Sequence, residues 1–420
     1  MTMAQRQSKD ISVYIDLQQN PIPIGTLHCE AVRGKEVFSF ELDSDWLKSG
    51  NFRQLDPDLG RFAGFQYLKE EKSNFGVFLD SSPDRWGRML IKRREALSAR
   101  TENRPARTLF ESDFLLGVYD GNRMGALRFK TNPNGRFLDG CTTLAAPPWT
   151  SVKDLEYASL QLEDEDLTAT EAGKWLNMLV MPGSSLGGAR PKANVKDDAG
   201  NLWIAKFPSR NDEKDMGAWE LLANRLARQC DIQVPECQSK SFLSQRHTFL
   251  SKRFDRTQDG RRIHFASAMT MLGLQDGDDF STGASYLMMA EFLMSDGANV
   301  DADLKELWRR IVFNIAISNC DDHLRNHGFL LTPKGWVLSP AYDLNPDEFG
   351  NGLKLNISED DNSLDFDLAL EVAPYFRIPY KEAKAVLEKI KEDVSRWRNL
   401  ASLIGIPKSE QEMCSAAFRV

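Results

Sequence analysis

Residues 318–331 of the chain read SNCDDHLRNHGFLL and hold two aspartates, two histidines and an asparagine between two apolar runs. Buried carboxylates and imidazoles need partners or a chemical task, so this stretch is either a solvated loop or a functional site. Asp321 and Asn326 lie five residues apart. A carboxylate and an amide at that spacing can orient an acceptor hydroxyl and bind a magnesium ion at one triphosphate, which is the chemistry of phosphoryl transfer.

Phosphoryl transfer by a kinase also requires a strand lysine, a helix glutamate and a second metal-binding aspartate. The run LWIAKF predicts a strand that contains Lys206, and Glu220 follows fourteen residues later in a predicted helix. An ion pair between these two side chains would hold the ammonium near the α- and β-phosphates. Asp343 follows an apparent hairpin, FLLTPKGWVLSP, and is placed to be the second magnesium ligand beside Asn326.

A glycine-rich segment, GSSLGGARPK, precedes the predicted strand. Gly183, Gly187 and Gly188 would let the backbone approach phosphate closely, and Lys192 would add positive charge. Gly183 and Gly188 have the spacing of a P-loop, but alanine and arginine follow where that motif requires lysine and then serine or threonine. The order of loop, lysine, glutamate, aspartate, asparagine and aspartate is the order of parts in a kinase.

Each of these features has a plainer interpretation when it is taken alone. A strand lysine is usually a solvated surface residue, and Glu220 alone would be a charge on a helix surface. Asp321 and Asn326 could cap a helix or shape a turn. His323 and His327 are expected to form local hydrogen bonds rather than to bind metal, because no third ligand has a suitable spacing. The kinase interpretation depends on the combination and on its order.

The elements that must position these residues follow from the apolar pattern. Two alternating segments, ISVYIDL and EVFSFEL, predict a small β-rich element in the first 45 residues. A helix is expected after Pro83, with Ser82 as its N-cap. Turn formers and prolines at 132–149 indicate a domain boundary.

After that boundary the pattern predicts a mixed half that contains strands, and then a mostly helical half from about residue 265. One apolar stripe with helical spacing comprises Leu304, Leu307, Trp308, Ile311, Val312 and Ile315. The helix that carries this stripe leads directly into the 318–331 stretch. Residues 381–405 predict another amphipathic helix, with Trp397 on its inward face.

Length and composition limit the class of protein. At 420 residues, two or three subdomains are expected, and 41% hydrophobic with 27% charged residues describes a soluble globular protein. The net charge is −8 without a lysine or arginine run, so direct binding to duplex DNA is not expected. Because the start has no apolar signal-peptide core and no run of about 18 apolar residues occurs, we expect a cytoplasmic protein without a membrane segment. Six scattered cysteines without a CxxC pair argue against structural zinc and disulfides.

In combination, these motifs resemble the HipA family of serine/threonine kinases, the toxins of bacterial toxin–antitoxin modules. SSLGGARPK is similar to the family's S-x-x-G-A-x-x-K loop, DDHLRNHGFLL to its D-x-H-x-x-N catalytic stretch, and LSPAYDLNP to its metal-binding turn. Residues 80–88 and 111–129 resemble the amino-terminal subdomain of longer members. The resemblance covers nearly the whole chain.

The resemblance implies a bilobal α+β fold of the protein-kinase-like class, related to the phosphatidylinositol kinases. We expect a β-rich accessory subdomain at residues 1–148 and a kinase N-lobe at 149–256 with the glycine-rich loop and the strand lysine. A helical C-lobe at 257–420 would carry the catalytic and metal-binding loops.

The resemblance also implies a role for each matching position of the catalytic stretch. Asp321 would be the catalytic aspartate and His323 would support its loop, while Asp322 fills a position that varies in the family. Asn326 and Asp343 would hold magnesium.

Contacts with ATP are implied for Ser185, Gly187, Gly188, Lys192, Lys206, Glu220 and Phe254. Phe254 lies in the segment that links the lobes and would be near the adenine. Ser185 matches the loop serine that family members autophosphorylate, with Ser184 as the alternative, and a phosphoserine would add about two negative charges where the ATP phosphates must lie. Phe265 stands where the family often has a polar residue that contacts the nucleotide.

Cofactors and partners are implied in the same way. The chain would use ATP and Mg²⁺, and it would assemble with a small HipB-like antitoxin that makes the contact with DNA. The phosphorylated substrate would be a protein, such as the aminoacyl-tRNA synthetases that are the targets of the best-known relatives. Unopposed expression would arrest growth.

Two other functions are compatible with parts of the sequence. Residues 183–187 satisfy G-x-S-x-G, the nucleophile elbow of α/β-hydrolases, but that elbow needs a strand directly before it, and EAGKWLNMLVM looks helical. A catalytically silent, nucleotide-binding regulator would keep the kinase fold without turnover. A serine-directed fluorophosphonate would identify the first function, and ATP binding without phosphotransfer would identify the second.

Overall fold

The computed structural model of the chain describes residues 8–17, 20–50, 52–69, 72–140, 146–164, 169–180, 188 and 190–420. The chain divides into two compact units. The first comprises Met1–Ala205 and Asp255–Ala266, and the second comprises Lys206–Phe254 and Ser267–Val420. The predicted boundary near residue 148 lies inside the first unit, and the predicted division into three domains stays a prediction.

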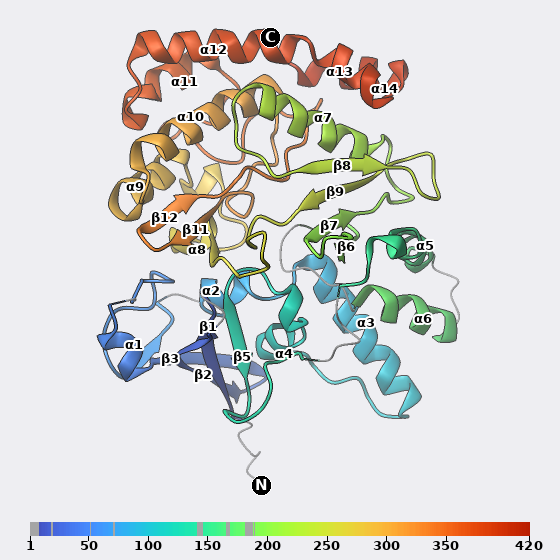
Figure 1. Cartoon of the computed structure of the whole chain (residues 1–420), viewed down its shortest axis with the longest axis vertical. Helices are drawn as coiled ribbons and strands as arrows, with labels where there is room; N and C mark the ends of the chain where they lie inside the picture. Colours follow the sequence, from blue (N-terminus) through green and yellow to red (C-terminus); the bar gives the residue numbers. More distant parts are fainter. Residues whose placement is uncertain are drawn as a thin grey trace. The chain divides into compact units, whose positions relative to one another are not determined.

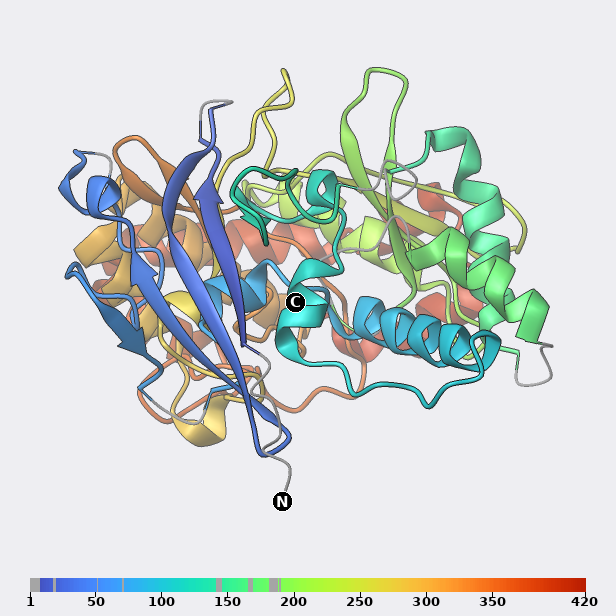
Figure 2. The same cartoon turned by 90° about the horizontal axis from the view of Figure 1, so that it is seen from below.

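An antiparallel sheet opens the first unit, with the strand order β4-β3-β2-β1-β5 (Figure 1). Its strands are β1 (Ser8–Ile15), β2 (Ile22–Val32), β3 (Lys35–Leu42), β4 (Phe65–Tyr67) and β5 (Leu127–Lys130). Ile11, Val13 and Ile15 are fully buried, and the residues between them are partly exposed. The alternation in ISVYIDL therefore gives one face of the sheet to the core, as period-two patterning predicts. Figure 2 shows the blue strands β1 to β3 side by side.

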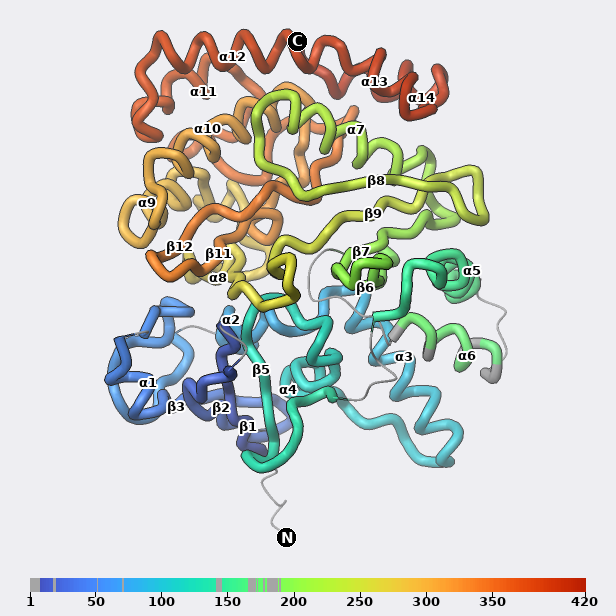
Figure 3. Tube along the Cα trace, in the orientation of Figure 1, coloured from blue at the N-terminus to red at the C-terminus, as the bar shows by residue number. Residues whose placement is uncertain are grey.

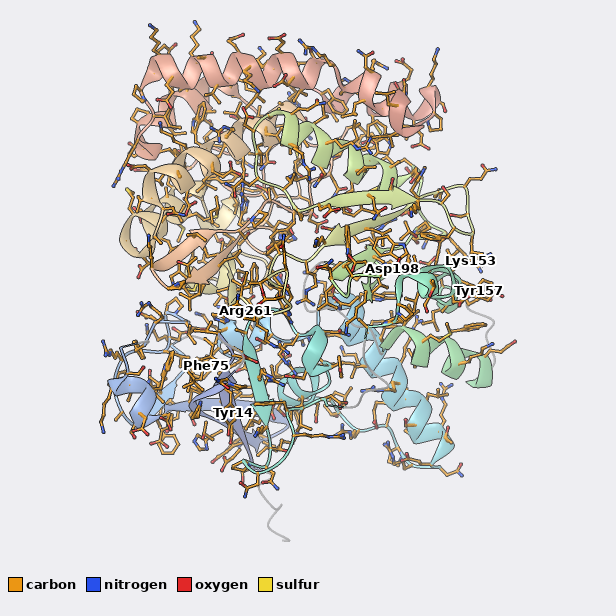
Figure 4. The ribbon with its side chains drawn as sticks, viewed as in Figure 1. Tyr14, Phe75, Lys153, Tyr157, Asp198 and Arg261 are labelled. Carbon is orange, nitrogen blue, oxygen red and sulfur yellow. The ribbon has the colours of Figure 1, made fainter. Side chains whose placement is uncertain are left out.

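Phenylalanine rings fill the core beneath this sheet. Phe40 of β3 lies 5.4 Å from Phe78, which lies 6.0 Å from Phe129 of β5, measured between ring centroids. Phe75 precedes α2 (Gly76–Asp80) and meets Phe78 edge-on. Figure 4 labels Phe75 and also Tyr14 of β1, in the same subdomain. Edge-to-face aromatic pairs of this kind stabilise a core by about 0.5–1.5 kcal/mol beyond their buried area.

The first unit also contains helices and a short pair of strands that follow the sheet. These elements are α1 (Ser44–Lys48), α2, α3 (Arg85–Thr101), α4 (Glu111–Leu116), η1 (Asp120–Asn122), η3 (Trp149–Ser151), α5 (Val152–Leu162), α6 (Ala169–Val180), β6 (Lys192–Lys196) and β7 (Leu202–Lys206), whose last residue begins the second unit. Helix α6 packs against both α3 and α5.

Helix α3 begins after Pro83, as predicted, but the predicted N-cap is wrong. The Asp84 side chain accepts a hydrogen bond from Gly87 N at 2.8 Å and caps the helix. Ser82 instead donates to Phe78 O at 2.8 Å, because it lies just past the end of α2 and satisfies a carbonyl there. The cap is thus two residues later, on a side chain that is 1% exposed.

The second unit consists mainly of helices. Its elements are α7 (Met216–Gln229), β8 (Cys237–Lys240), β9 (Thr248–Lys252), α8 (Ala268–Met271), η4 (Phe280–Thr282), α9 (Tyr286–Asp296), α10 (Val300–Ala316), β11 (Gly328–Thr332), β12 (Gly335–Leu338), α11 (Phe366–Val372), η5 (Ala373–Phe376), α12 (Tyr380–Ser395), α13 (Trp397–Ile404), α14 (Lys408–Met413) and η6 (Cys414–Ala417), and β10 (Phe265–Ser267) spans the unit boundary.

Helix α10 is the centre of the second unit. Its predicted apolar stripe, from Leu304 to Ile315, is fully buried. Helices α9, α11 and α12 and strand β12 pack around it, and Figure 1 shows α12 running along one side of α10. Because α10 ends at Ala316, this buried helix fixes the start of the 318–331 stretch.

The hairpin that was predicted to follow this stretch is present. Strands β11 and β12 pair antiparallel, with Phe329 opposite Leu338 and Thr332 opposite Gly335. Gly335, the first residue of β12, has a φ of 138°, a value that favours glycine. This conformation lets the chain enter β12 directly after the turn. The hairpin delivers the chain to Ser339 and, four residues later, to Asp343.

The predicted helix at 381–405 is two helices, α12 and α13, which follow one another along the last part of the tube in Figure 3. The break lies at Arg396. Trp397, directly after it, stacks on Phe418 with 4.0 Å between ring centroids and an interplanar angle of 8°. Tertiary packing of this ring therefore overrides a helical pattern that continues in the sequence. Among the described residues, the helices are too short or too polar to cross a membrane.

Candidate active site

Lys206 lies between two carboxylates in the second unit. Its Nζ atom is 2.6 Å from Glu220 Oε1 and 2.5 Å from Asp343 Oδ1. Strand β7 ends at Lys206, Glu220 lies in the second turn of α7, and the hairpin brings Asp343 to the same place. Burial lowers the pKa of Lys206, but the two carboxylates outweigh this and raise its pKa above the ordinary value. The ammonium is therefore charged at neutral pH.

Asp343 is held in an uncommon backbone conformation. Its φ is 59°, in the left-handed region that costs a non-glycine residue about 1 kcal/mol or more and that aspartate tolerates better than most. Tyr342, its neighbour, donates from its hydroxyl to Arg325 O at 2.8 Å. Asn345 N donates to Asn319 Oδ1 at 3.2 Å. Hydrogen bonds on both sides of Asp343 thus attach its turn to the 318–331 stretch.

The two adjacent aspartates of that stretch have opposite surroundings. Asp322 is 2% exposed and accepts hydrogen bonds from Tyr286 Oη at 2.6 Å and Asn314 Nδ2 at 2.6 Å. His327 Nε2 also lies 2.7 Å from the same Asp322 oxygen. Asp321 is exposed. Asp322 therefore organises the loop from inside, and Asp321 presents its carboxylate to solvent.

The charge state of Asp322 follows from its partners. Burial raises the pKa of this carboxyl, but the His327 imidazole and the hydrogen bonds from His327 and Tyr286 outweigh burial and lower the pKa below its ordinary value. Asp322 is therefore ionised inside the protein, which is the state that accepts three hydrogen bonds. The same environment raises the pKa of Tyr286, by burial first and by the Asp322 charge second.

Asn326 is oriented by the backbone of the same loop. Its Nδ2 atom donates to Asp321 O at 2.9 Å, and the side chain is nearly buried. With the amide nitrogen engaged, the Oδ1 atom is left as an acceptor, which is the atom that would face a magnesium ion. In the described part of the chain, no three His, Cys, Asp or Glu side chains form a metal site. An amide oxygen and a carboxylate are oxygen ligands of the kind that magnesium accepts, so Asn326 and Asp343 fit an ion whose other ligands would be water and substrate phosphates.

His323 occupies a half-buried position next to Asp321. Its backbone N donates to Asp321 O at 2.9 Å. Within the described residues, its ring Nδ1 is buried without a hydrogen-bond partner. The backbone of His323 thus contacts the catalytic loop, and the supporting role that the resemblance implies for its side chain stays a prediction.

The predicted glycine-rich loop lies largely outside the described residues, and this includes Ser184, Ser185 and Gly187. Helix α6 ends at Val180, three residues before Gly183. The described residues that lead to G-x-S-x-G are therefore helical, which contradicts the strand that a nucleophile elbow requires. The hydrolase alternative is wrong on this point.

Lys192, at the end of the loop, is buried rather than open to solvent. It is 1% exposed, and its Nζ lies 3.2 Å from Asp84 Oδ2 and donates to Gly188 O at 3.2 Å. Because Asp84 also caps α3, this pair attaches the end of the glycine-rich loop to a helix of the first unit. The predicted contacts of Lys192 and Gly188 with ATP stay predictions, and the structure shows an anchoring contact for both.

Phe254 and Phe265 are the two phenylalanines that the family resemblance places near the nucleotide. Phe254 packs against the ring of Tyr342, with 5.5 Å between centroids, and so lies near the turn that carries Asp343. Its predicted contact with adenine stays a prediction. Phe265 is 2% exposed, so its ring belongs to the core rather than to a polar nucleotide contact.

Two residues that anchor the predicted loops, one in each unit, were not predicted. Asp84 and Asp322 are both nearly fully buried carboxylates, the first paired with Lys192 and the second in contact with His327. The partners of Asp322 include Tyr286, which is 36 residues away, and Lys192 is more than 100 residues from Asp84. The sequence does hold a weak signal for Asp322, since His327 follows it at the same five-residue interval that separates Asp321 from Asn326.

Comparison with solved structures identifies the fold. The chain resembles the HipA protein in a structure titled as the toxin–antitoxin system HipA, HipB and operator DNA complex of Shewanella oneidensis MR-1. The TM-score is 0.67 at 18% sequence identity, over 97% of this chain and 94% of that one. The predicted α+β, protein-kinase-like fold is confirmed.

The chain belongs to the HipA family. The model of the HipA-like C-terminal domain matches residues 184–398, just over half of the sequence. Two curated relatives carry the name "Putative kinase". One, Y4dM of Sinorhizobium fredii, is 29% identical over 228 residues, 50% of this chain and 53% of that protein. The other, from Haemophilus influenzae, is 28% identical over 180 residues, 38% of this chain and 52% of that protein. The chain thus spans about half the length of these relatives.

Proposed function

We propose that this protein is an ATP-dependent protein serine/threonine kinase that acts as a HipA-like toxin. The observation that supports this most directly is Lys206, held at 2.6 Å by Glu220 and at 2.5 Å by Asp343. Protein kinases use a strand lysine fixed by a helix glutamate to hold the α- and β-phosphates, beside a metal-binding aspartate. The membership in the HipA family and the names of the relatives agree with this activity.

The proposed reaction transfers the γ-phosphoryl group of ATP to a serine or threonine hydroxyl. A bond forms between the hydroxyl oxygen and the γ-phosphorus, the bond from phosphorus to the bridging oxygen breaks, and ADP leaves. Asp321 is exposed, so a substrate hydroxyl can reach its carboxylate. In this proposal Asp321 orients that hydroxyl and accepts its proton. Lys206 offsets negative charge on the phosphates. Magnesium, held by Asn326 and Asp343, would neutralise charge that develops on the phosphate oxygens.

The finer parts of the proposal come from the family. The protein would autophosphorylate Ser185, or Ser184, in its glycine-rich loop, and Phe254 would contact the adenine. Its partner would be a HipB-like antitoxin that binds DNA, as in the complex named for the Shewanella structure. Its substrate would be a cytoplasmic protein such as an aminoacyl-tRNA synthetase.

The test is mass analysis of purified, phosphatase-treated protein after incubation with ATP and magnesium, beside Asp321→Asn. We expect one phosphate on Ser185 or Ser184 in the active form and none in the variant. If ATP binds but neither the protein itself nor any protein of a bacterial extract gains phosphate, the kinase proposal is wrong and the fold serves a silent, nucleotide-binding regulator. Phosphate gained equally by Asp321→Asn would contradict the role of Asp321.

A further inference from the structure

The segment Glu410–Arg419 contacts the start of α7. It covers most of α14, all of η6 and the two residues beyond η6. Glu410 Oε2 accepts hydrogen bonds from Asp215 N at 3.1 Å and from Trp219 Nε1 at 2.9 Å. Asp215 caps α7, and Trp219 directly precedes Glu220. One oxygen of Glu410 thus holds the first turn of the helix that presents Glu220 to Lys206.

The other end of the 410–419 segment contacts the start of the catalytic stretch. Arg419 N donates to Ala316 O at 2.9 Å, and Arg419 Nε donates to Ser318 Oγ at 3.0 Å. Ala316 is the last residue of α10, and Ser318 has a φ of 48° in the left-handed region. The same turn receives the segment that follows Asp343, because Asp347 N donates to Ser318 O at 3.1 Å. Arg419 therefore contacts the turn where the catalytic and metal-binding segments join.

Aromatic packing stiffens the connection between these ends. Phe418, next to Arg419, stacks on Trp397, and both rings lie 6.0–6.3 Å from Trp219 between centroids. Trp219 is fully buried and is also the residue whose indole N–H binds Glu410. The two ends of the segment thus share one packed ring cluster rather than being separate surface contacts.

A second set of contacts, made by Lys214, joins the same parts of the protein. Lys214, next to the cap of α7, lies 2.5 Å from Glu348 Oε2 and 3.6 Å from Cys414 Sγ. Glu348 belongs to the segment after Asp343, and Cys414 belongs to the 410–419 segment. The start of α7, the segment after Asp343 and the 410–419 segment therefore meet at one ammonium group.

We propose that the 410–419 segment couples the position of α7 to that of the catalytic stretch, with Glu410 and Arg419 as positioning residues. Energetic coupling between sites is carried by contiguous packed and hydrogen-bonded elements, and this segment supplies such a route from Glu220 to Asp321. Neither residue would touch substrate. The inference about catalysis rests on the proposed kinase function, whereas the mechanical coupling does not.

The first test is amide hydrogen exchange on the full chain, with Glu410→Ala compared with Glu412→Ala. Glu412 lies on the same helix and forms an exposed ion pair with Arg398, so it is a matched control. Loss of the Glu410 contacts should speed exchange in α7 residues 216–222 and also at 318–326, about threefold or more at both places. Glu410→Gln keeps one side-chain oxygen that can accept both hydrogen bonds, so it should restore most of the protection. Faster exchange that stays within α7 would overturn the proposed coupling.

The second test is kinetic. Because α7 carries Glu220, Glu410→Ala should raise KM for ATP several-fold. Because Arg419 contacts the turn before Asp321, Arg419→Ala should lower kcat by about tenfold with KM for ATP within a factor of two. The double variant should lose less than the product of the two single losses, since either change already interrupts the connection. Fully multiplicative losses would contradict coupling through one segment.

The two proposals fail in different ways. Absence of phosphotransfer from the wild-type protein to itself and to proteins of a bacterial extract would overturn the kinase function. The exchange experiment would then still decide the coupling, because it follows backbone amides and needs no turnover. If turnover is normal but Glu410→Ala speeds hydrogen exchange only in α7 and not at 318–326, the kinase function stands and the proposed coupling is wrong.

Discussion

The ammonium of Lys206 touches Asp343 Oδ1 at 2.5 Å, so the proposed metal ligand is paired with a cation. Glu220 contacts the same ammonium. Magnesium at Asp343 Oδ1 would compete with this ammonium for the same oxygen. The binding of magnesium should therefore depend on the charge of Lys206.

A melting experiment tests this dependence. Magnesium alone should raise the Tm of the wild-type protein little, because Lys206 competes for Asp343. In Lys206→Met the competing charge is gone, and magnesium should raise Tm more, by an amount that follows the usual dependence of stability on ligand concentration. Equal magnesium shifts in both proteins would contradict the competition. Asp343→Asn in the Lys206→Met background is the control and should abolish the shift.

Substitution by asparagine should lower turnover at Asp321 and lower stability at the adjacent Asp322. Asp321→Asn should lower turnover by about 10²-fold or more and leave the Tm and the affinity for ATP nearly unchanged, because Asp321 is exposed. Asp322→Asn should destabilise the fold by about 3 kcal/mol, because it removes the buried charge opposite His327. Thermal melts and single-turnover phosphotransfer on both variants separate the two effects. A large fall in Tm for Asp321→Asn would reverse the assignment.

The buried pair of Lys192 and Asp84 should be structural. Lys192→Met leaves the Asp84 carboxylate buried and without its ammonium partner, and it should destabilise the fold by about 3–5 kcal/mol. The double variant Lys192→Met with Asp84→Asn should recover part of that loss, since Asn keeps a side-chain acceptor for the α3 cap. Denaturant unfolding measures both. If Lys192→Met left stability unchanged and only weakened ATP binding, the nucleotide contact predicted from the sequence would be the better interpretation.

His247 should make stability depend on pH. Its Nδ1 lies 2.5 Å from Asp215 Oδ2, and this hydrogen bond raises the pKa of His247 above its ordinary value of about 6.5 despite partial burial. A pKa raised in the folded state means that the contribution to stability is complete below about pH 6.5 and is lost as the pH rises through the folded-state pKa. As the pH rises from about 6.5 through the folded-state pKa of His247, the Tm of the wild-type protein should fall more than the Tm of His247→Gln. Parallel Tm profiles for the two proteins would contradict this.

Much of the site could be predicted because its parts are local patterns. Lys206 ends β7, Glu220 lies in α7 and Asp343 follows the β11–β12 hairpin, so the apolar patterns of strand, helix and hairpin were enough to predict the Lys206–Glu220 pair, whereas the contact of Lys206 with Asp343 was not predicted. The network of Asp322 could not be predicted, since its partners come from helices whose packing the sequence does not state. The cap at Asp84 and the helix break at Arg396 were missed for a related reason. A buried lysine and a stacked ring decide these positions through tertiary contacts.

The φ of 59° at Asp343 also limits which residues evolution can place there. A left-handed backbone excludes β-branched and bulky side chains and is accepted most readily by glycine, asparagine and aspartate. Of these three, glycine offers no ligand and asparagine carries no charge, so aspartate alone combines the required shape with a negative oxygen. A glutamate at this position would have the right charge on a backbone that disfavours it. The backbone of the turn and the proposed metal ligation therefore favour the same residue at this position for two different reasons.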